Sequence, residues 1–263
     1  MPHIAFHRIW AIVLRNLYLY KRSIDRLTDS FFWPVIDLVV LGLTASYFSA
    51  ATGSSPDLII PMVTGIILWM FVYRSQFEFA SGLLEDVYNK NLVNIFVSPI
   101  RFSEWTFALF IHAIIKTIVT VIFGVGVAYL LYGINILPFI PALLPYIVLL
   151  ILCGLWFGFI ITGIILRLGT RVQAFAWGLI WVTAPFSAIY YPMSVLPEWA
   201  QNIGSLLPAS YAFEGMRAIL SGVPTTNGLA TGLLLNALYI VLGAWFLRRS
   251  FKKVLNDGLV KVF

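Results

Sequence analysis

Charge is scarce in this chain. Asp, Glu, Lys and Arg make up 11% of its 263 residues, whereas 60% of the residues are hydrophobic. Soluble domains carry about 25% charged residues, so a chain of this composition cannot cover its surface in water. The scarcity of charge predicts an integral membrane protein.

Several chemical motifs are also missing. Cys153 is the single cysteine, which excludes an intrachain disulfide. Neither the P-loop pattern G-x-x-x-x-G-K-[ST] nor a G-x-S-x-G elbow occurs. His3, His7 and His112 are not spaced near carboxylates as metal ligands would be. We therefore expect no catalytic motif, no metal site and no cofactor bound by this chain.

The charge that is present is mostly positive, with a formal net charge of +6. Basic loops on the cytoplasmic side of a membrane protein give this sign without any nucleic-acid partner, and we expect none. The first thirty residues contain several Arg and Lys and no compact apolar core. They do not predict a cleavable signal peptide.

Long apolar runs are abundant. About 20 helical residues cross a hydrocarbon core, and backbone groups in lipid must pair within a helix. We predict six transmembrane helices in an all-α fold, at residues 31–50, 58–80, 107–132, 139–166, 172–192 and 229–247. Residues 1–263 then form a single transmembrane domain.

The basic residues give the orientation. Segments 1–30, 81–106, 167–171 and 248–263 hold fourteen of the seventeen Lys and Arg, whereas the connections on the other side hold only Arg217. The positive-inside rule then places both termini in the cytoplasm. We expect a multi-pass protein of the inner (plasma) membrane.

The N-terminal segment 1–30 predicts an interfacial helix. Arg8, Arg15 and Arg22 recur every seven residues and are expected to face lipid headgroups. An apolar face steps by three or four through Phe6, Trp10, Val13, Leu17 and Tyr20. The alternative is a basic leader that only sets topology. Asp29 or Ser30 is expected to cap the first span, with Pro34 in its first turn.

The external segment 193–228 predicts a re-entrant helical hairpin. Pro192, Pro197 and Pro208 divide the region into apolar stretches too short to cross a membrane. Glu214 and Arg217 are three residues apart and are expected to pair. The alternative is a plain surface loop.

Charged residues also occur inside the predicted spans, where each costs about 2.5–3.5 kcal/mol at a helix centre unless it finds a partner. Arg74 and Glu78 are four residues apart and could pair. Lys116 could pair with Asp37 or with Glu78. These intramembrane polar residues either line a translocation path or tie helices together.

Two longer segments resemble a known family. They are LLEDVYNKNLVNIFVSPIRFSEW after the second predicted span and YPMSVLPEWAQNIGSLLPASYAFEGMRAIL after the fifth. With the basic N-terminal helix, this layout resembles the permease subunit of a type-two ABC exporter. Leu207 stands where that family commonly has Asn, which weakens the match at that turn.

The resemblance implies a coupling helix within residues 85–99 that docks on a separate ABC ATPase subunit. Apolar residues would anchor the contact, and charged residues would set its register at the rim. The anchor would be Leu92, Val93, Ile95 and Phe96, and the rim would be Glu85, Asp86 and Lys90. The alternative is an amphipathic loop resting on the membrane.

The resemblance further implies two ATPase chains and a second permease chain, as a homodimer in membrane lipid. ATP and Mg²⁺ would then be bound by the ATPase partner. The cargo would be an amphiphilic drug, a lipid-linked glycan or a polysaccharide. The alternatives are a secondary transporter or channel, which would favour internal repeats, and an intramembrane enzyme, which would need clustered acids, His or Ser.

Aromatic residues bear on the cargo without deciding it. They could stack on sugars or on flat drug-like rings, or they could form interfacial belts and ordinary packing. They are Trp69, Phe71, Tyr73, Trp156, Trp177, Trp181, Tyr190 and Tyr191.

Overall fold

The computed structural model describes residues 5–51, 59–89, 91–223 and 228–257, and every regular element within these ranges is helical. Some side chains inside these ranges are outside the description: Asp25, Val87, Tyr88, Leu92, Val93, Phe96, Thr170, Gln173, Phe175, Ala176, Leu255 and Asp257. The α-helices are α1 (Phe6–Lys21), α2 (Ile24–Ala51), α3 (Ile59–Tyr88), α4 (Leu92–Val97), α5 (Phe102–Tyr132), α6 (Ile140–Leu168), α7 (Gln173–Thr183), α8 (Glu198–Ser205), α9 (Pro208–Leu220) and α10 (Leu229–Asp257). Short 3₁₀ turns are η2 (Leu137–Phe139), η3 (Thr170–Val172), η4 (Ala184–Phe186) and η5 (Met193–Val195).

Five stretches of the described chain are long and apolar enough to cross a membrane. They are Arg26–Ala51, Ile59–Asp86, Phe102–Tyr132, Leu137–Leu168 and Leu229–Val254. Two of them leave most of their surface outward: 22% of the first and 17% of the last are buried in the chain, although both are apolar. Such surfaces suit lipid rather than water. The all-α, multi-pass membrane fold is confirmed.

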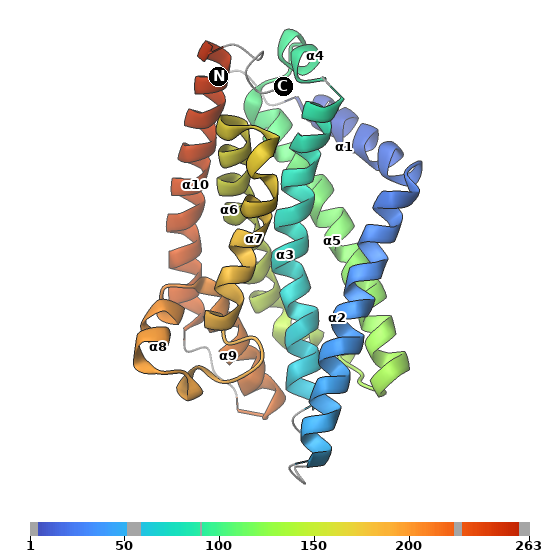
Figure 1. Ribbon diagram of the computed structural model, residues 1–263, viewed down its shortest axis with the longest axis vertical. Helices are drawn as coiled ribbons and strands as arrows, with labels where there is room; N and C mark the ends of the chain where they lie inside the picture. The colour runs from blue at the N-terminus through green and yellow to red at the C-terminus, as the bar shows by residue number, and fades with distance from the viewer. Residues whose placement is uncertain (1–4, 52–58, 90, 224–227, 258–263) are drawn as a thin grey trace.

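The fifth predicted span, 172–192, is not confirmed as a full-length helix. Helix α7 has 11 residues, which is about 17 Å at 1.5 Å per residue. It passes into η4, where Pro185 cannot continue the α-helical hydrogen bonding. Helix α7 nevertheless leads from the end of α6 back toward α8 and α9 (Figure 1).

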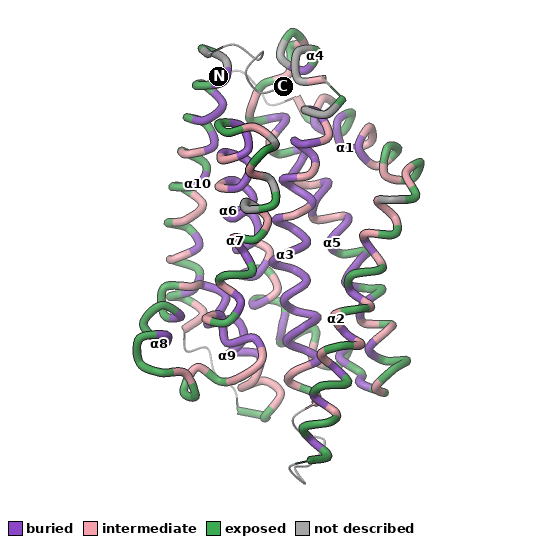
Figure 2. The backbone as a smooth tube through the Cα atoms, viewed as in Figure 1, coloured by how far each residue is buried: buried purple, intermediate pink, exposed green. Residues whose placement is uncertain are grey.

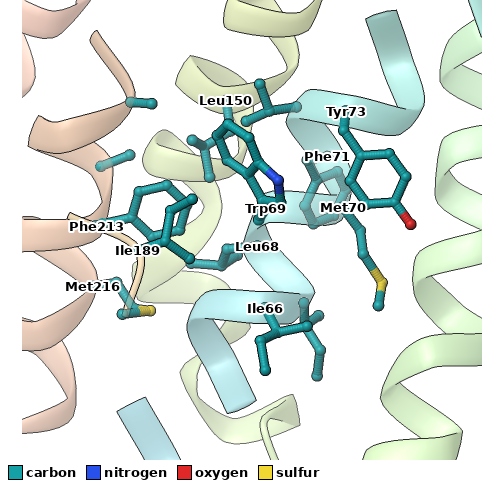
Figure 3. Packing of buried hydrophobic residues seen from close by; sticks show 14 of the residues in the cluster. Ile66, Leu68, Trp69, Met70, Phe71, Tyr73, Leu150, Ile189, Phe213 and Met216 are labelled. Atoms are coloured by element: carbon teal, nitrogen blue, oxygen red, sulfur yellow. The ribbon is translucent and has the colours of Figure 1, made fainter. Parts of the chain in front are cut away.

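Helix α3 forms the centre of the bundle. Helices α2, α5, α6 and α9 all contact it, and 78% of its candidate span is buried (Figure 2). In Figure 3, side chains of α3 meet Leu150 of α6 and Phe213 of α9, with the Trp69 and Phe213 ring centroids 6.3 Å apart. A charged side chain on α3 is therefore surrounded by several other helices of the domain.

Close approach and polar ties hold α6 to its neighbours. Gly154 packs so tightly on α3 that an added Cβ would lie 2.6 Å from the Val72 carbonyl oxygen. On the other side of α6, Asn236 of α10 accepts a hydrogen bond from Trp156 Nε1 at 3.0 Å and donates one to the Leu149 carbonyl at 3.0 Å. Small residues and buried amides are the usual means of joining helices in lipid.

The start of α2 differs from the prediction. Helix α2 begins at Ile24, so Pro34 lies inside it and Asp29 and Ser30 do not cap it. Both side chains instead accept hydrogen bonds from Arg74 of α3. Sequence showed good capping residues before an apolar run, but it did not show the arginine that binds them.

The two ends of the molecule differ. Helix α1, helix α4 and the end of α10 lie at one end, and α8 and α9 lie at the other (Figure 1). This agrees with the predicted arrangement, in which the first group is cytoplasmic.

Cysteine labelling tests which side each end faces. Cys153 is buried, whereas Asn202 on α8 and Asn256 on α10 are exposed. In intact cells, Asn202→Cys is expected to react with a membrane-impermeant maleimide. Asn256→Cys is expected to react only after the membrane is opened. The reverse pattern would overturn the orientation.

Candidate coupling loop and intramembrane charge cluster

The loop between α3 and α5 carries the short helix α4. Within the predicted segment 85–99 a short helix is present at Leu92–Val97, and Ser98 and Pro99 lead into α5. Helix α3 runs on to Tyr88, past the end of its apolar span at Asp86. The loop is thus mounted directly on two membrane-spanning helices.

Asp86 holds this loop from within. It is 3% exposed, and its carboxylate accepts hydrogen bonds from Arg15 Nη2 at 2.8 and 3.1 Å, Asn91 Nδ2 at 3.2 Å and Trp105 Nε1 at 3.3 Å. These contacts join α1, α3 and α5. Asp86 was predicted at the rim of the contact with the ATPase, and that role stays a prediction; within the chain its carboxylate organises the loop.

Glu85 is also engaged within the chain. Its half-buried carboxylate forms an ion pair with Arg26 of α2. Helices α2 and α3 are therefore joined close to the α3–α5 loop. Glu85 is not free to set the register of a partner unless Arg26 releases it.

Helix α4 presents apolar residues both inward and outward. Ile95 is 6% exposed and belongs to a buried cluster with Ile9, Val13 and Trp105, so it cannot anchor an external partner as predicted. Val97 is 82% exposed. The other predicted contact residues, Lys90 and the side chains of Leu92, Val93 and Phe96, lie outside the described residues, and their role stays a prediction.

The start of α1 binds the C-terminal end of the same loop and the first turn of α5. Arg8 Nη1 donates to the Pro99 carbonyl at 2.5 Å. Glu104, buried in the first turn of α5, accepts from the Ala5 and Arg101 amides at 2.9 and 3.0 Å. Arg8 and Arg15 were predicted to face lipid headgroups. Instead, Arg8 binds Pro99 of the loop and Glu104 of α5, and Arg15 binds Asp86 near the end of α3.

A buried charge cluster lies deeper along α3. Glu78 is 1% exposed and binds two cations, Arg74 through Oε1 and Lys116 through Oε2. Arg74 also reaches Asp29 Oδ2 at 3.1 Å and Ser30 Oγ at 2.9 Å. Both predicted pairings with Glu78 are present, and the cluster contains equal numbers of positive and negative charges.

The cluster borders a cavity of about 300 Å³ and reaches α1 through Tyr20. The Lys116 ammonium lies 4.2 Å from the centre of the Tyr20 ring, and burial raises the pKa of the Tyr20 hydroxyl. Residues of α1, α3 and α5 take part both in the cluster and in the contacts of Asp86. A movement of the α3–α5 loop would therefore also move the charged residues inside the membrane.

Asp37, the other candidate partner of Lys116, lies apart from the cluster. Its half-buried side chain faces a second cavity, of about 360 Å³, between α2, α3 and α7. Sequence spacing along separate helices could not distinguish it from Glu78.

Within the segment predicted to be external, the described residues form two short helices, α8 and α9. Pro192 and Pro197 occupy the N-cap positions of η5 and α8, and Pro208 begins α9. Glu214 accepts from the Met193 amide at 2.7 Å and from Arg217 Nη2 at 3.2 Å, which confirms that predicted pair. Arg217 also binds the Ala188 carbonyl, and burial lowers the pKa of its guanidinium.

A comparison with protein families places these features together. Residues 7–221 match the family described as ABC-2 type transporter. A comparison with curated proteins gave no match. The family match runs from α1 through the end of α9 and includes the α3–α5 loop, the charge cluster and the helices α8 and α9. The chain therefore belongs to the ABC-2 type transporter family and is a transmembrane component of such a transporter.

Proposed function

We propose that this chain is the permease subunit of an ATP-driven exporter, energised by a separate ABC ATPase subunit that contacts α4. Two permease chains and two ATPase chains form the working unit. The ATPase binds ATP and Mg²⁺, and the permease carries an amphiphilic or glycan-type substrate out of the cytoplasm.

The observation that carries the proposal is the set of contacts that attaches the α3–α5 loop to the neighbouring helices. Asp86 joins the loop to α1 and α5, and Glu85 joins it to α2. A partner that displaces α4 therefore acts on four helices at once. Nucleotide binding that closes the two ATPase chains would move α4, and the connected spans would rearrange into an outward path.

An exposed valine on α4 offers a direct test. Val97→Asp is expected to weaken binding of the partner ABC ATPase by about tenfold, because it leaves a charge at an apolar contact. Substrate-stimulated ATP hydrolysis and export from vesicles should fall with it. Co-purification and vesicle export are the measurements.

The matched control is Val195→Asp, at the opposite end of the molecule, where the valine is 71% exposed. It makes the same chemical change and should bind the ATPase normally. Normal ATPase binding by Val97→Asp would contradict the proposal that the ATPase contacts α4. Export driven by an ion gradient without any ATPase would favour a secondary transporter instead.

A further inference from the structure

The cavity beside Asp37 has an unusual lining for the interior of a membrane protein. It lies about 17 Å along the first candidate span, counting eleven residues from Arg26 at 1.5 Å each. Five aromatic rings from three helices contribute to it. The lining residues are Asp29, Trp33, Asp37, Tyr73, Arg74, Gln76, Phe77, Trp177, Ile180 and Trp181.

The charge of Asp37 is uncompensated within the described part of the chain. No hydrogen bond or ion pair reaches its carboxylate there, although a lone carboxylate in a membrane interior is costly. The Arg74 guanidinium also lines the cavity, but it is occupied by Glu78 and Asp29. Among the charged residues that line the cavity, Arg74 and Asp29 cancel each other. The carboxylate of Asp37 therefore leaves the cavity with one negative charge.

The rings are arranged around this charge. Tyr73 and Trp181 have centroids 5.6 Å apart, and Phe77 and Trp177 have centroids 5.0 Å apart. Trp33 and Trp181 are half exposed, at 53% and 47%, so a ligand could contact them from the lipid-facing side. Ring faces attract cations electrostatically, most strongly where water is excluded.

Two residues that line the cavity carry buried polar atoms without hydrogen-bond partners among the described residues. Tyr73 is 8% exposed and Gln76 is 2% exposed, yet Tyr73 Oη and Gln76 Nε2 have no hydrogen-bond partner among the described residues. In Figure 3 the Tyr73 hydroxyl points away from the Trp69 and Phe213 contact. Buried polar groups are normally satisfied, so each needs an explanation.

The geometry points to a binding site for an amphiphilic organic cation, with its positive group beside Asp37 and its apolar part against the aromatic rings. Tyr73 Oη can accept a hydrogen bond from a protonated amine, and Gln76 Nε2 can donate one to an oxygen of the ligand. Identifying this ligand class as exported cargo rests on the proposed function. The binding itself does not.

Binding of tetraphenylphosphonium to the full chain in lipid nanodiscs tests the site. Asp37→Asn keeps the shape and the hydrogen-bonding ability of the side chain but removes its charge. It is expected to weaken tetraphenylphosphonium binding about tenfold in equilibrium dialysis, since a desolvated cation loses its counter-charge. Binding of neutral triphenylphosphine oxide should change by less than about twofold, because it needs no counter-charge.

Two further variants keep the result interpretable. Asp37→Glu retains the charge and should keep most of the affinity, whereas Glu198→Gln removes an exposed carboxylate on α8 and should change nothing. Unchanged tetraphenylphosphonium binding by Asp37→Asn would overturn the cation site and favour a neutral, glycan-like ligand stacked on the same rings. The assay contains no ATPase. Cation binding that survives while the Val97 test fails would therefore reject only the exporter proposal.

Discussion

Replacement of Glu78 by glutamine is expected to lower the free energy of unfolding by about 3–5 kcal/mol, the usual cost of removing one partner from a buried ion pair. Glu78, Arg74 and Lys116 are all less than 10% exposed. The amide could accept one hydrogen bond but would supply no charge to either cation. Arg74 would keep Asp29, whereas Lys116 would keep no anionic partner among those the structure gives it. A denaturation series on the purified chain in mixed micelles measures the loss.

The control for this prediction is a compensating change. Lys116→Met with Glu78→Gln should recover a large part of the loss, because the stranded ammonium is gone and a buried ion pair is often replaceable by apolar packing. Additive losses would mean that the two residues do not interact. An exposed carboxylate, removed in Glu198→Gln, should cost within about 0.5 kcal/mol.

The same pair of variants separates the two roles left open for the intramembrane charges. If the double variant recovers both stability and export, the cluster is a tie between helices. If it recovers stability but not export, the charges line the path. The adjoining 300 Å³ cavity, which Glu78, His112 and Lys116 all border, makes the second result physically reasonable.

The length and apolarity of helices could be predicted from sequence, because lipid demands both. Five of the six predicted spans correspond to long helices, and several helices extend beyond the prediction at the end that carries α4: α3 reaches Tyr88 and α10 reaches Asp257. Hydropathy detects where lipid begins, whereas a helix continues for as long as its residues find partners. The interruption of α7 at Pro185 was harder to weigh because the apolar pattern runs through it.

Partners within one helix were predictable, and most partners between helices were not. Arg74 with Glu78 and Glu214 with Arg217 follow from helical spacing alone. Arg15 and Asp86 are 71 residues apart, and their contact depends on how α1 rotates and packs against α5. The useful signal in the sequence was that the acidic pair Glu85–Asp86 and the basic N-terminal helix were predicted on the same side of the membrane. The prediction instead assigned the acidic pair to a separate ATPase partner and the basic helix to lipid headgroups.

Loss of Asp86 is expected to uncouple ATP hydrolysis from export. Its carboxylate receives a two-oxygen contact from Arg15 and further bonds from Asn91 and Trp105. Hydrogen bonds to charged groups contribute about 1.5–3 kcal/mol each, so loss of the bonds from Arg15, Asn91 and Trp105 in Asp86→Ala should weaken loop docking by at least about 3 kcal/mol. That is about a hundredfold in the docking equilibrium. The spans should still insert, because the rest of their apolar surface is unchanged.

The expected signature is specific to transmission. Within the proposed exporter, the ATPase should still bind through α4 and hydrolyse ATP at its basal rate, whereas stimulation by substrate and export should each fall by at least tenfold. Arg15→Met should give a defect of the same kind, and the double variant should be no worse than Asp86→Ala alone, because Asp86→Ala already removes the contact with Arg15. Glu85→Ala is the milder control, since its partner Arg26 is 33% exposed and such pairs contribute about 0–1 kcal/mol. If Asp86→Ala exported at the native rate, force would have to pass from α4 to the spans by another route, and the contacts of Asp86 would serve only to shape the loop.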